Sequence, residues 1–156
     1  MGRISAIYLM PHPPIIIPEV GRGEERKVQN TSDALDKCAR HILDLKPDTI
    51  IVITPHGPVF RDAIAINTRH RLAGSLSRFG ASDVSMAFEN DLKLVQYIMD
   101  EAERMGIACI GIDNRTAIEY RLTPLLDWGT LVPLYFVTKQ YREFKLVHIS
   151  ISLMSY

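Results

Sequence analysis

The sequence has few of the features that mark secreted, membrane-bound or disulfide-rich proteins. Only Cys38 and Cys109 are cysteines in the 156 residues, too few for a disulfide framework, so we expect a reducing compartment. The N-terminal apolar run stops at Pro11, which is too short for a signal peptide. No stretch approaches the roughly 20 apolar residues that cross a bilayer. We therefore expect a cytoplasmic chain without a membrane partner.

The sequence also lacks an excess of either charge. It has 18 lysines and arginines against 18 aspartates and glutamates, so its formal net charge is zero. A balanced chain is not typical of proteins that grip nucleic acid through a polybasic surface, and we expect no nucleic-acid partner. What the chain does have is 47% hydrophobic residues, enough for a core. Its length predicts one domain over residues 1–156.

The first half of the chain has the pattern of a strand, a helix and a second strand. Ile4–Met10 is a short apolar run that ends at Pro11 and predicts a buried strand, followed by a loop rich in proline. Apolar residues spaced by three and four predict a helix over Glu24–Lys46. Thr49–Thr54 predicts the next strand. Such a unit would place its two strands parallel, with a right-handed crossover.

The second half continues this alternation, and we expect an α/β fold: a mostly parallel sheet with helices on its faces. We expect a loop over 70–85 and a helix over Asp91–Met105, with Asn90 as its N-cap and Gly106 just beyond its end. The expected strands are Asp62–Asn67, Ile107–Ile112, Val132–Thr138 and Lys145–Ser152. Because no helix follows the last strand to cover it, we expect either a homo-oligomer or a missing C-terminal half.

Two short motifs match each other, and each contains a histidine. Pro11-His12-Pro13-Pro14 follows the first predicted strand, and Pro55-His56-Gly57-Pro58 follows the second. The carboxyl ends of neighbouring parallel strands meet at one edge of a sheet, where α/β proteins bind their ligands. One such histidine alone would be interpreted as a loop residue bonded to backbone or water. The matched pair predicts that His12 and His56 bind one metal ion.

The order of these motifs resembles the class III extradiol dioxygenases, and most closely the dioxygenase-like domain of the AmmeMemoRadiSam and Memo group. The matching stretches are Leu9–Ile15, Pro55–Pro58 and Leu126–Tyr135. The resemblance covers essentially the whole chain, which looks like the N-terminal part of such a domain. It implies that His12 and His56 are the two histidine ligands of a ferrous ion, with zinc as the alternative metal, completed by a carboxylate. It also implies a small aromatic diol as substrate and a further histidine as acid and base.

The chain departs from the family pattern in two places. It has Asp127-Trp128-Gly129 where the family usually has Asp-His-Gly. The family's third ligand and acid/base histidine lie beyond residue 156. We therefore expect an extradiol ring-cleavage dioxygenase-like protein that is inactive as the isolated chain. The alternative is a non-catalytic Memo-like module for metal binding or protein interaction. A metal-free hydrolase or phosphorylase-like protein is a third hypothesis, which lacks a nucleophile elbow and a phosphate-binding glycine loop.

Other polar residues are candidate substitutes for the missing ligand or candidate reactive groups. The acids near the expected strand ends and loops are interpreted as solvated or capping residues: Glu19, Glu24, Asp62 and Asp113. We interpret His148, which lies within an apolar run, as a core histidine, and we expect His41 and His70 on the surface. Trp128 is interpreted as a packing residue, and Cys38 and Cys109 as inert core thiols.

Overall fold

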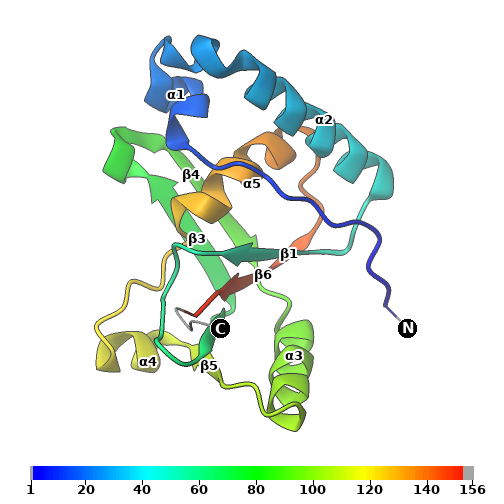
Figure 1. Ribbon diagram of the computed structural model, residues 1–156, viewed down its shortest axis with the longest axis vertical. Helices are drawn as coiled ribbons and strands as arrows, with labels where there is room; N and C mark the ends of the chain where they lie inside the picture. Colours follow the sequence, from blue (N-terminus) through cyan, green and yellow to red (C-terminus); the bar gives the residue numbers. More distant parts are fainter. Residues whose placement is uncertain (1, 153–156) are drawn as a thin grey trace.

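The computed structural model describes residues 2–152 and has a four-stranded central sheet (Figure 1). Its strand order is β1 (Thr49–Thr54), β6 (Lys145–Ser150), β2 (Ile64–Asn67) and β5 (Cys109–Ile112). β1 pairs with β6 in parallel and β2 with β5 in parallel, whereas β2 and β6 are antiparallel. The expected α/β class with a mostly parallel sheet is confirmed.

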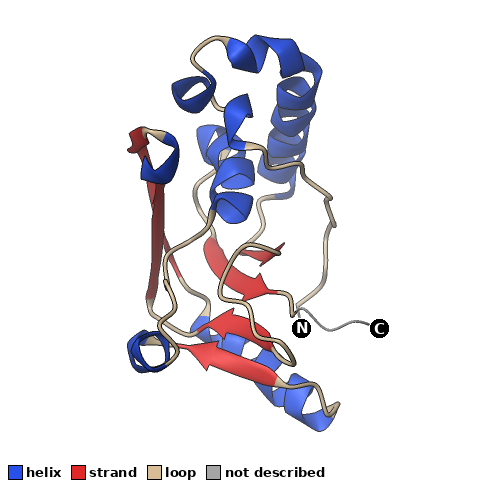
Figure 2. Cartoon of the chain, turned by 60° about the vertical axis from the view of Figure 1, so that its left-hand side comes forward, coloured by secondary structure: helices blue, strands red, loops and turns tan. Residues whose placement is uncertain are grey.

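Helices lie on both sides of this sheet, as Figures 1 and 2 show. α2 (Gln29–Leu45) and α5 (Trp128–Gln140) pack together on one side, and α3 (Leu92–Arg104) and α4 (Asn114–Glu119) contact the strands on the other. Strand β6 contributes side chains to the cores on both faces of the sheet, because successive side chains point to opposite faces. Leu146 belongs to the core with α2 and α5, while Val147 and Ile149 pack with residues of α3.

The predicted helices form, with small shifts at their ends. Leu35, Ala39 and Ile42 are the buried stripe of α2, which a 3₁₀ turn over Glu24–Val28 precedes. Asp91, not Asn90, caps α3, since its carboxylate accepts a hydrogen bond from the Leu94 N–H at 3.1 Å. The Asn90 amide instead donates to the carbonyl oxygens of Asn67 and Arg69, which holds β2 and the following loop.

The strand predicted over Ile4–Met10 is wrong. This segment has no strand or helix pattern and crosses the molecule as an extended ribbon near β1 and α2 (Figure 1). Its side chains are largely solvent-exposed, at 80% for Ile4 and 102% for Leu9. The Tyr8 hydroxyl is hydrogen-bonded to His41 Nδ1 on α2 at 2.9 Å. The predicted strand-helix-strand unit therefore does not form, because an apolar run becomes a strand only where its backbone finds a partner.

Two further expectations are corrected. Val132–Thr138 lies inside helix α5 rather than in a strand, and its residues are buried on nearly every side. Such a helix has no polar face and so no 3.6-residue period that a sequence pattern could reveal. The loop expected over residues 70–85 contains β3 (Arg71–Leu76), a 3₁₀ turn at Ser77–Phe79 and the start of β4 (Ala81–Glu89). These strands form the separate antiparallel hairpin seen beside the helices in Figure 2.

The remaining elements are short. The predicted loop after Pro11 contains a 3₁₀ turn at Pro14–Ile16 and the single helical turn α1 (Pro18–Gly21). Strand β6 was expected to lie uncovered at an edge, but it lies between β1 and β2 with Leu146–Ser150 buried. No helix in the described part of the chain is long and apolar enough to cross a membrane.

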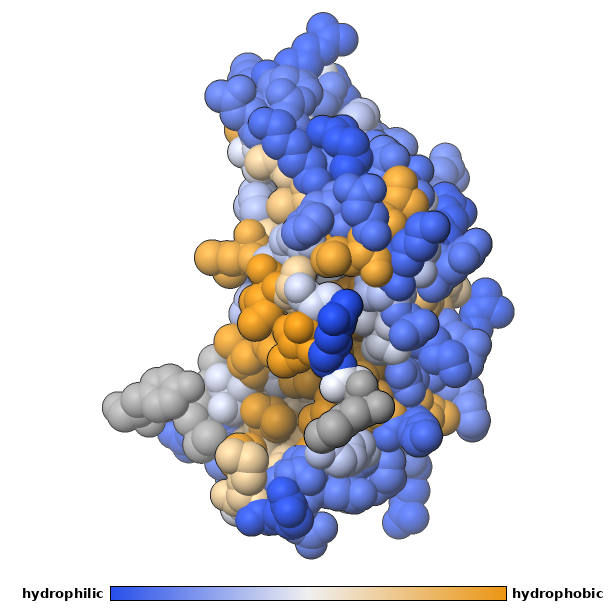
Figure 3. All heavy atoms as spheres, turned by 90° about the vertical axis from the view of Figure 1, so that its right-hand side faces the viewer, coloured by the Kyte–Doolittle hydropathy of each residue, from blue (hydrophilic) through white to orange (hydrophobic). Residues whose placement is uncertain are grey.

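The exposed edge of the sheet is β1, and it gives a first prediction. Ile53 is 65% exposed and Ile51 45%, and apolar side chains gather in the middle of the face shown in Figure 3. An apolar edge strand favours pairing with another chain, so we expect the chain to self-associate at micromolar concentration. Sedimentation velocity should show association that weakens in Ile53→Lys but not in Ile118→Lys, a control in α4 that is 80% exposed. A monomer at every concentration would contradict this.

Candidate metal centre

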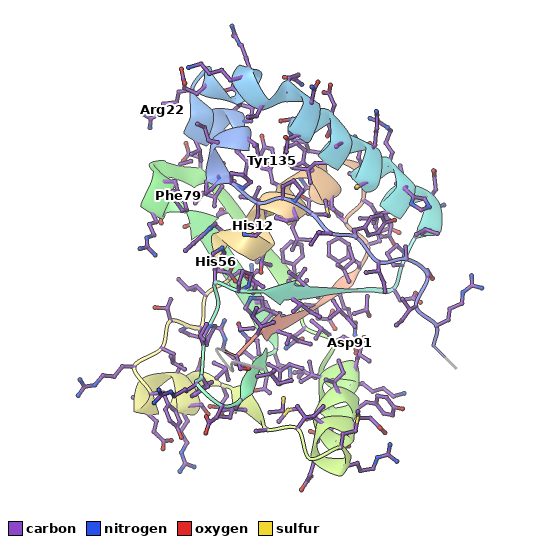
Figure 4. The ribbon with its side chains drawn as sticks, in the orientation of Figure 1. His12, Arg22, His56, Phe79, Asp91 and Tyr135 are labelled. Atoms are coloured by element: carbon purple, nitrogen blue, oxygen red, sulfur yellow. The ribbon has the colours of Figure 1, made fainter. Side chains whose placement is uncertain are left out.

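The two predicted histidines meet beyond the carboxyl end of β1. His56 follows this strand through Pro55, and His12 precedes the Pro14–Ile16 turn. Figure 4 shows the two side chains side by side, near the start of α5. Their Nε2 atoms are 3.0 Å apart although 44 positions separate them in sequence, and their rings are edge to face at 74°. The expected convergence is confirmed, even though His12 follows an irregular segment rather than a strand.

The distance between these nitrogens suits two ligands of one metal ion. Two imidazole nitrogens bonded at about 2.1 Å to one ion, at right angles, lie about 3.0 Å apart. The observed 3.0 Å equals this separation, and it is also the length of a hydrogen bond between the two rings. His56 is exposed and His12 half-buried, so the site opens to solvent and leaves room for further ligands. The pair therefore fits two adjacent positions of a metal ion.

Trp128 fixes the orientation of one member of the pair. Its indole stacks on the His56 ring with centroids 4.3 Å apart and planes inclined by 25°. Phe79 packs edge-on against Trp128 with ring centroids 5.7 Å apart, and the Arg78 guanidinium lies 5.5 Å from the centroid of the same indole. Trp128 is thus a packing residue, as expected, but it packs on a candidate ligand and limits the rotation of that ring.

A buried hydrogen-bond network holds the backbone of the His56 loop. Asp127 stands at the N-cap position of α5, yet its carboxylate makes no capping bond to a helix N–H. Its Oδ1 accepts from the Thr54 hydroxyl at 2.7 Å and its Oδ2 from His148 Nε2 at 2.9 Å. Thr54 Oγ1 in turn accepts from the His56 backbone N–H at 3.2 Å. The network joins β6, the end of β1 and the start of α5 at the candidate ligand.

Asp127 remains ionised in this environment. Burial raises the pKa of its carboxyl, but the hydrogen bonds from His148 and Thr54 outweigh burial and the net pKa is lowered. The side chains of Asp127 and His148 are 6% and 2% exposed. An ionised carboxylate accepts only, so His148 Nε2 carries the proton in this contact. His148 is therefore a satisfied core histidine, as predicted.

Two glycines allow the loops to approach this closely. A Cβ on Gly129 would lie 2.5 Å from Thr54 Oγ1, 2.8 Å from Asp127 Oδ1 and 3.1 Å from His56 Cδ2. A Cβ on Gly57 would collide with the Ser150 hydroxyl, which is buried and has no hydrogen-bond partner within the described residues. Both glycines are therefore required by the packing of the His56 loop against α5 and β6.

No carboxylate of the described residues completes the pair. Within residues 2–152, no three histidine, cysteine or acidic side chains come together as a metal site. Glu19 accepts from the Tyr135 hydroxyl at 2.9 Å, Glu24 pairs with Lys27, and Asp113 caps α4. Asp62 is exposed. These acids have the loop and capping roles that were expected of them.

The sequence pattern missed the supporting residues Thr54, Asp127 and His148. A signal did exist, since Asp127 immediately precedes Trp128 in the stretch that carries the resemblance, and His148 is a polar residue within an apolar strand. The two thiols, Cys38 and Cys109, are half-buried and unpaired. Burial raises the pKa of the Cys109 thiol, as expected for an unreactive cysteine.

Comparison with known proteins agrees with the geometry. Residues 6–155 match the family described as the catalytic LigB subunit of aromatic ring-opening dioxygenase. A curated relative, protein CA_C1420 of Clostridium acetobutylicum, is 40% identical over 152 residues, which are 97% of this chain. The match covers 32% of that relative, so the chain spans about a third of its length. The chain belongs to the LigB family of aromatic ring-opening dioxygenase catalytic subunits.

Proposed function

We propose that this chain supplies the two-histidine half of a non-haem metal site in an extradiol dioxygenase-like protein that opens a catechol-type ring. The observation that carries the proposal is the 3.0 Å separation of His12 Nε2 and His56 Nε2, which suits adjacent ligands of one ion. Membership in the LigB family supports the reaction class. Ferrous iron is the proposed metal and zinc the alternative, because neutral imidazole binds both.

Each residue of the site has a defined part in this proposal. His12 and His56 would hold the ion through Nε2, and Trp128 stacks on the His56 ring and limits its rotation. Asp127, through Thr54, fixes the backbone on which His56 stands. A ferrous ion held there would supply the Lewis acidity and redox chemistry for the reaction of a diol with dioxygen. Within residues 2–152 no acidic side chain joins the pair as a third ligand.

Metal binding can be measured through Trp128, the sole tryptophan of the chain. A paramagnetic ion on His56 would lie within a few ångströms of the stacked indole, so anaerobic titration with ferrous or cobaltous ion should quench its fluorescence. His12→Ala and His56→Ala should each weaken binding by at least about tenfold, since each removes one of two ligands. His70→Ala, an exposed histidine of the β2–β3 loop, is the matched control. Equal binding by all variants would overturn the proposal.

One observation favours the Memo-like, non-catalytic alternative. Trp128 stands where the resembled family has a histidine, and indole has a donor N–H but no basic nitrogen at neutral pH. A module of this kind would bind metal through the same pair and would not open a ring in any protein that contains it. Ring cleavage by a protein that contains this chain, lost in His12→Ala, would exclude this alternative, and metal binding without cleavage would support it.

A further inference from the structure

A second polar site lies at the other pair of parallel strands. A hollow of about 610 Å³ opens between the loop after β2 and the corner between β5 and α4. β2 and β5 pair in register from Ile64 with Cys109 to Asn67 with Ile112, so their carboxyl ends lie next to each other. The Thr68 N–H donates to the Ile112 carbonyl at 3.0 Å and closes the floor of this corner. Its lining residues include neither His12 nor His56.

The orientation of the strands separates this hollow from the histidine pair. β2 is antiparallel to β6, and β6 is parallel to β1. The strands that end at the hollow therefore run opposite to β1, whose carboxyl end leads to His56. Like His56 at the end of β1, the polar residues of the hollow follow the carboxyl ends of parallel strands, where α/β proteins bind ligands. The strands at the hollow are β2 and β5.

Positive charge dominates the lining. Three arginines line the hollow, Arg69 from the loop after β2, Arg71 from the start of β3 and Arg115 from α4, and Asp113 is the one acid among the lining residues. Within residues 2–152 none of these arginines forms an ion pair. The Asp113 carboxylate accepts from the Thr116 N–H at 2.7 Å and so serves α4. With His70 neutral, the lining carries three positive charges and one negative charge.

Arg69 is held in place before any ligand arrives. Its Nε donates to Asn67 Oδ1 at 3.3 Å, and its Nη2 donates to the Pro124 carbonyl. Asn67 is buried and also donates to the Pro124 carbonyl, which ties the guanidinium to the sheet and to the chain leading to α5. Burial lowers the pKa of Arg69, so its charge is partly desolvated and has no anionic partner within the described residues. A fixed guanidinium of this kind binds anions at a smaller entropic cost than a free one.

We propose that this hollow binds a phosphate-bearing small molecule through Arg69, Arg71 and Arg115. Guanidinium groups match phosphate oxygens in pairs, and the volume lies within the range of ligand sites. A phosphomonoester or diphosphate carries about two or more negative charges at neutral pH, which offsets the surplus of two positive charges in the lining. A monocarboxylate carries one.

The test is isothermal titration of the whole chain with inorganic pyrophosphate, phenyl phosphate and acetate. Pyrophosphate and phenyl phosphate should bind saturably and acetate should not. Binding of pyrophosphate alone would assign the site to the free inorganic anion, and binding of both would assign it to phosphate groups on larger molecules. Arg71→Ala and Arg115→Ala are exposed positions, and each should weaken binding by about tenfold or more. Arg40→Ala, an exposed arginine of α2, is the matched control.

Several outcomes would overturn the inference. Absence of saturable binding of either phosphate compound at millimolar concentration would do so, as would equal loss of affinity in Arg40→Ala. Circular dichroism of each variant separates loss of binding from loss of fold. Because His12→Ala leaves all three arginines in place, it should bind pyrophosphate normally, so failure of the metal proposal would not affect this one.

Discussion

Loaded anaerobically with ferrous iron and then given protocatechuate or catechol in air, the chain should consume dioxygen no faster than the same iron in buffer. Ring opening requires a firmly held ion and a group that moves protons. His12 and His56 supply two neutral ligands, but no acidic side chain joins them within residues 2–152. A carboxylate normally offsets part of the metal charge, so two imidazoles alone hold ferrous iron weakly.

The proton-transferring group is lacking in the described structure as well. His148 is buried and its Nε2–H is committed to Asp127 at 2.9 Å, so this imidazole cannot reach a substrate above the His56 ring. Trp128 covers that ring instead. General acid/base catalysis is worth about 100- to 10,000-fold, so its loss alone should bring turnover close to the background rate.

The rate of oxygen consumption, measured with an oxygen electrode, tests this prediction, and two variants serve as comparisons. Trp128→His introduces the residue type of the resembled family and should still fail, because the third ligand remains missing. His12→Ala should give the same background as the unmodified chain. Turnover by the unmodified chain that disappears in His12→Ala would contradict the prediction and would point to a substitute ligand from Glu19, Asp62 or a second copy.

The contact between His12 and His56 could be predicted from sequence for a reason that did not depend on the exact fold. Each histidine is one residue after a proline that ends an apolar run. Strand pairing of Ile4–Met10 was the wrong intermediate step. The result still held, because Pro13 and Pro14 turn the chain into the 3₁₀ helix whose Ile16 is buried in the core.

The helix α5 could not be predicted from its pattern, and the supporting network depends on it. Its buried residues surround the helix, so the segment resembles a strand with a proline near its start. Asp127 was consequently placed before a strand and not recognised as the residue that joins Thr54 to His148. Contacts between side chains distant in sequence depend on register and on helix position, neither of which hydrophobic periodicity specifies.

Replacement of Asp127 by alanine should lower the free energy of unfolding by about 1–3 kcal/mol for each buried donor that loses its acceptor. His148 would lose its acceptor while only 2% exposed, and Thr54 would lose the acceptor that orients its hydroxyl toward the His56 N–H. Urea unfolding followed by circular dichroism measures the loss. Asp113→Ala, which removes an exposed cap of α4, is the matched control and should cost much less.

The same carboxylate should give the protein part of its acid sensitivity. The folded-state pKa of Asp127 is lowered, because the hydrogen bonds from His148 and Thr54 outweigh the raising effect of burial. The unfolded value is about 3.9. A lowered pKa stabilises the fold fully above the unfolded value, and this stabilisation disappears as the pH falls through the folded value. Asp127→Asn keeps the size of the side chain but cannot titrate, so its stability should fall less steeply below about pH 4. If Asp127→Asn and the unmodified chain lose stability in parallel over that range, the carboxylate is not the group responsible, and the network does not hold the His56 loop by charge.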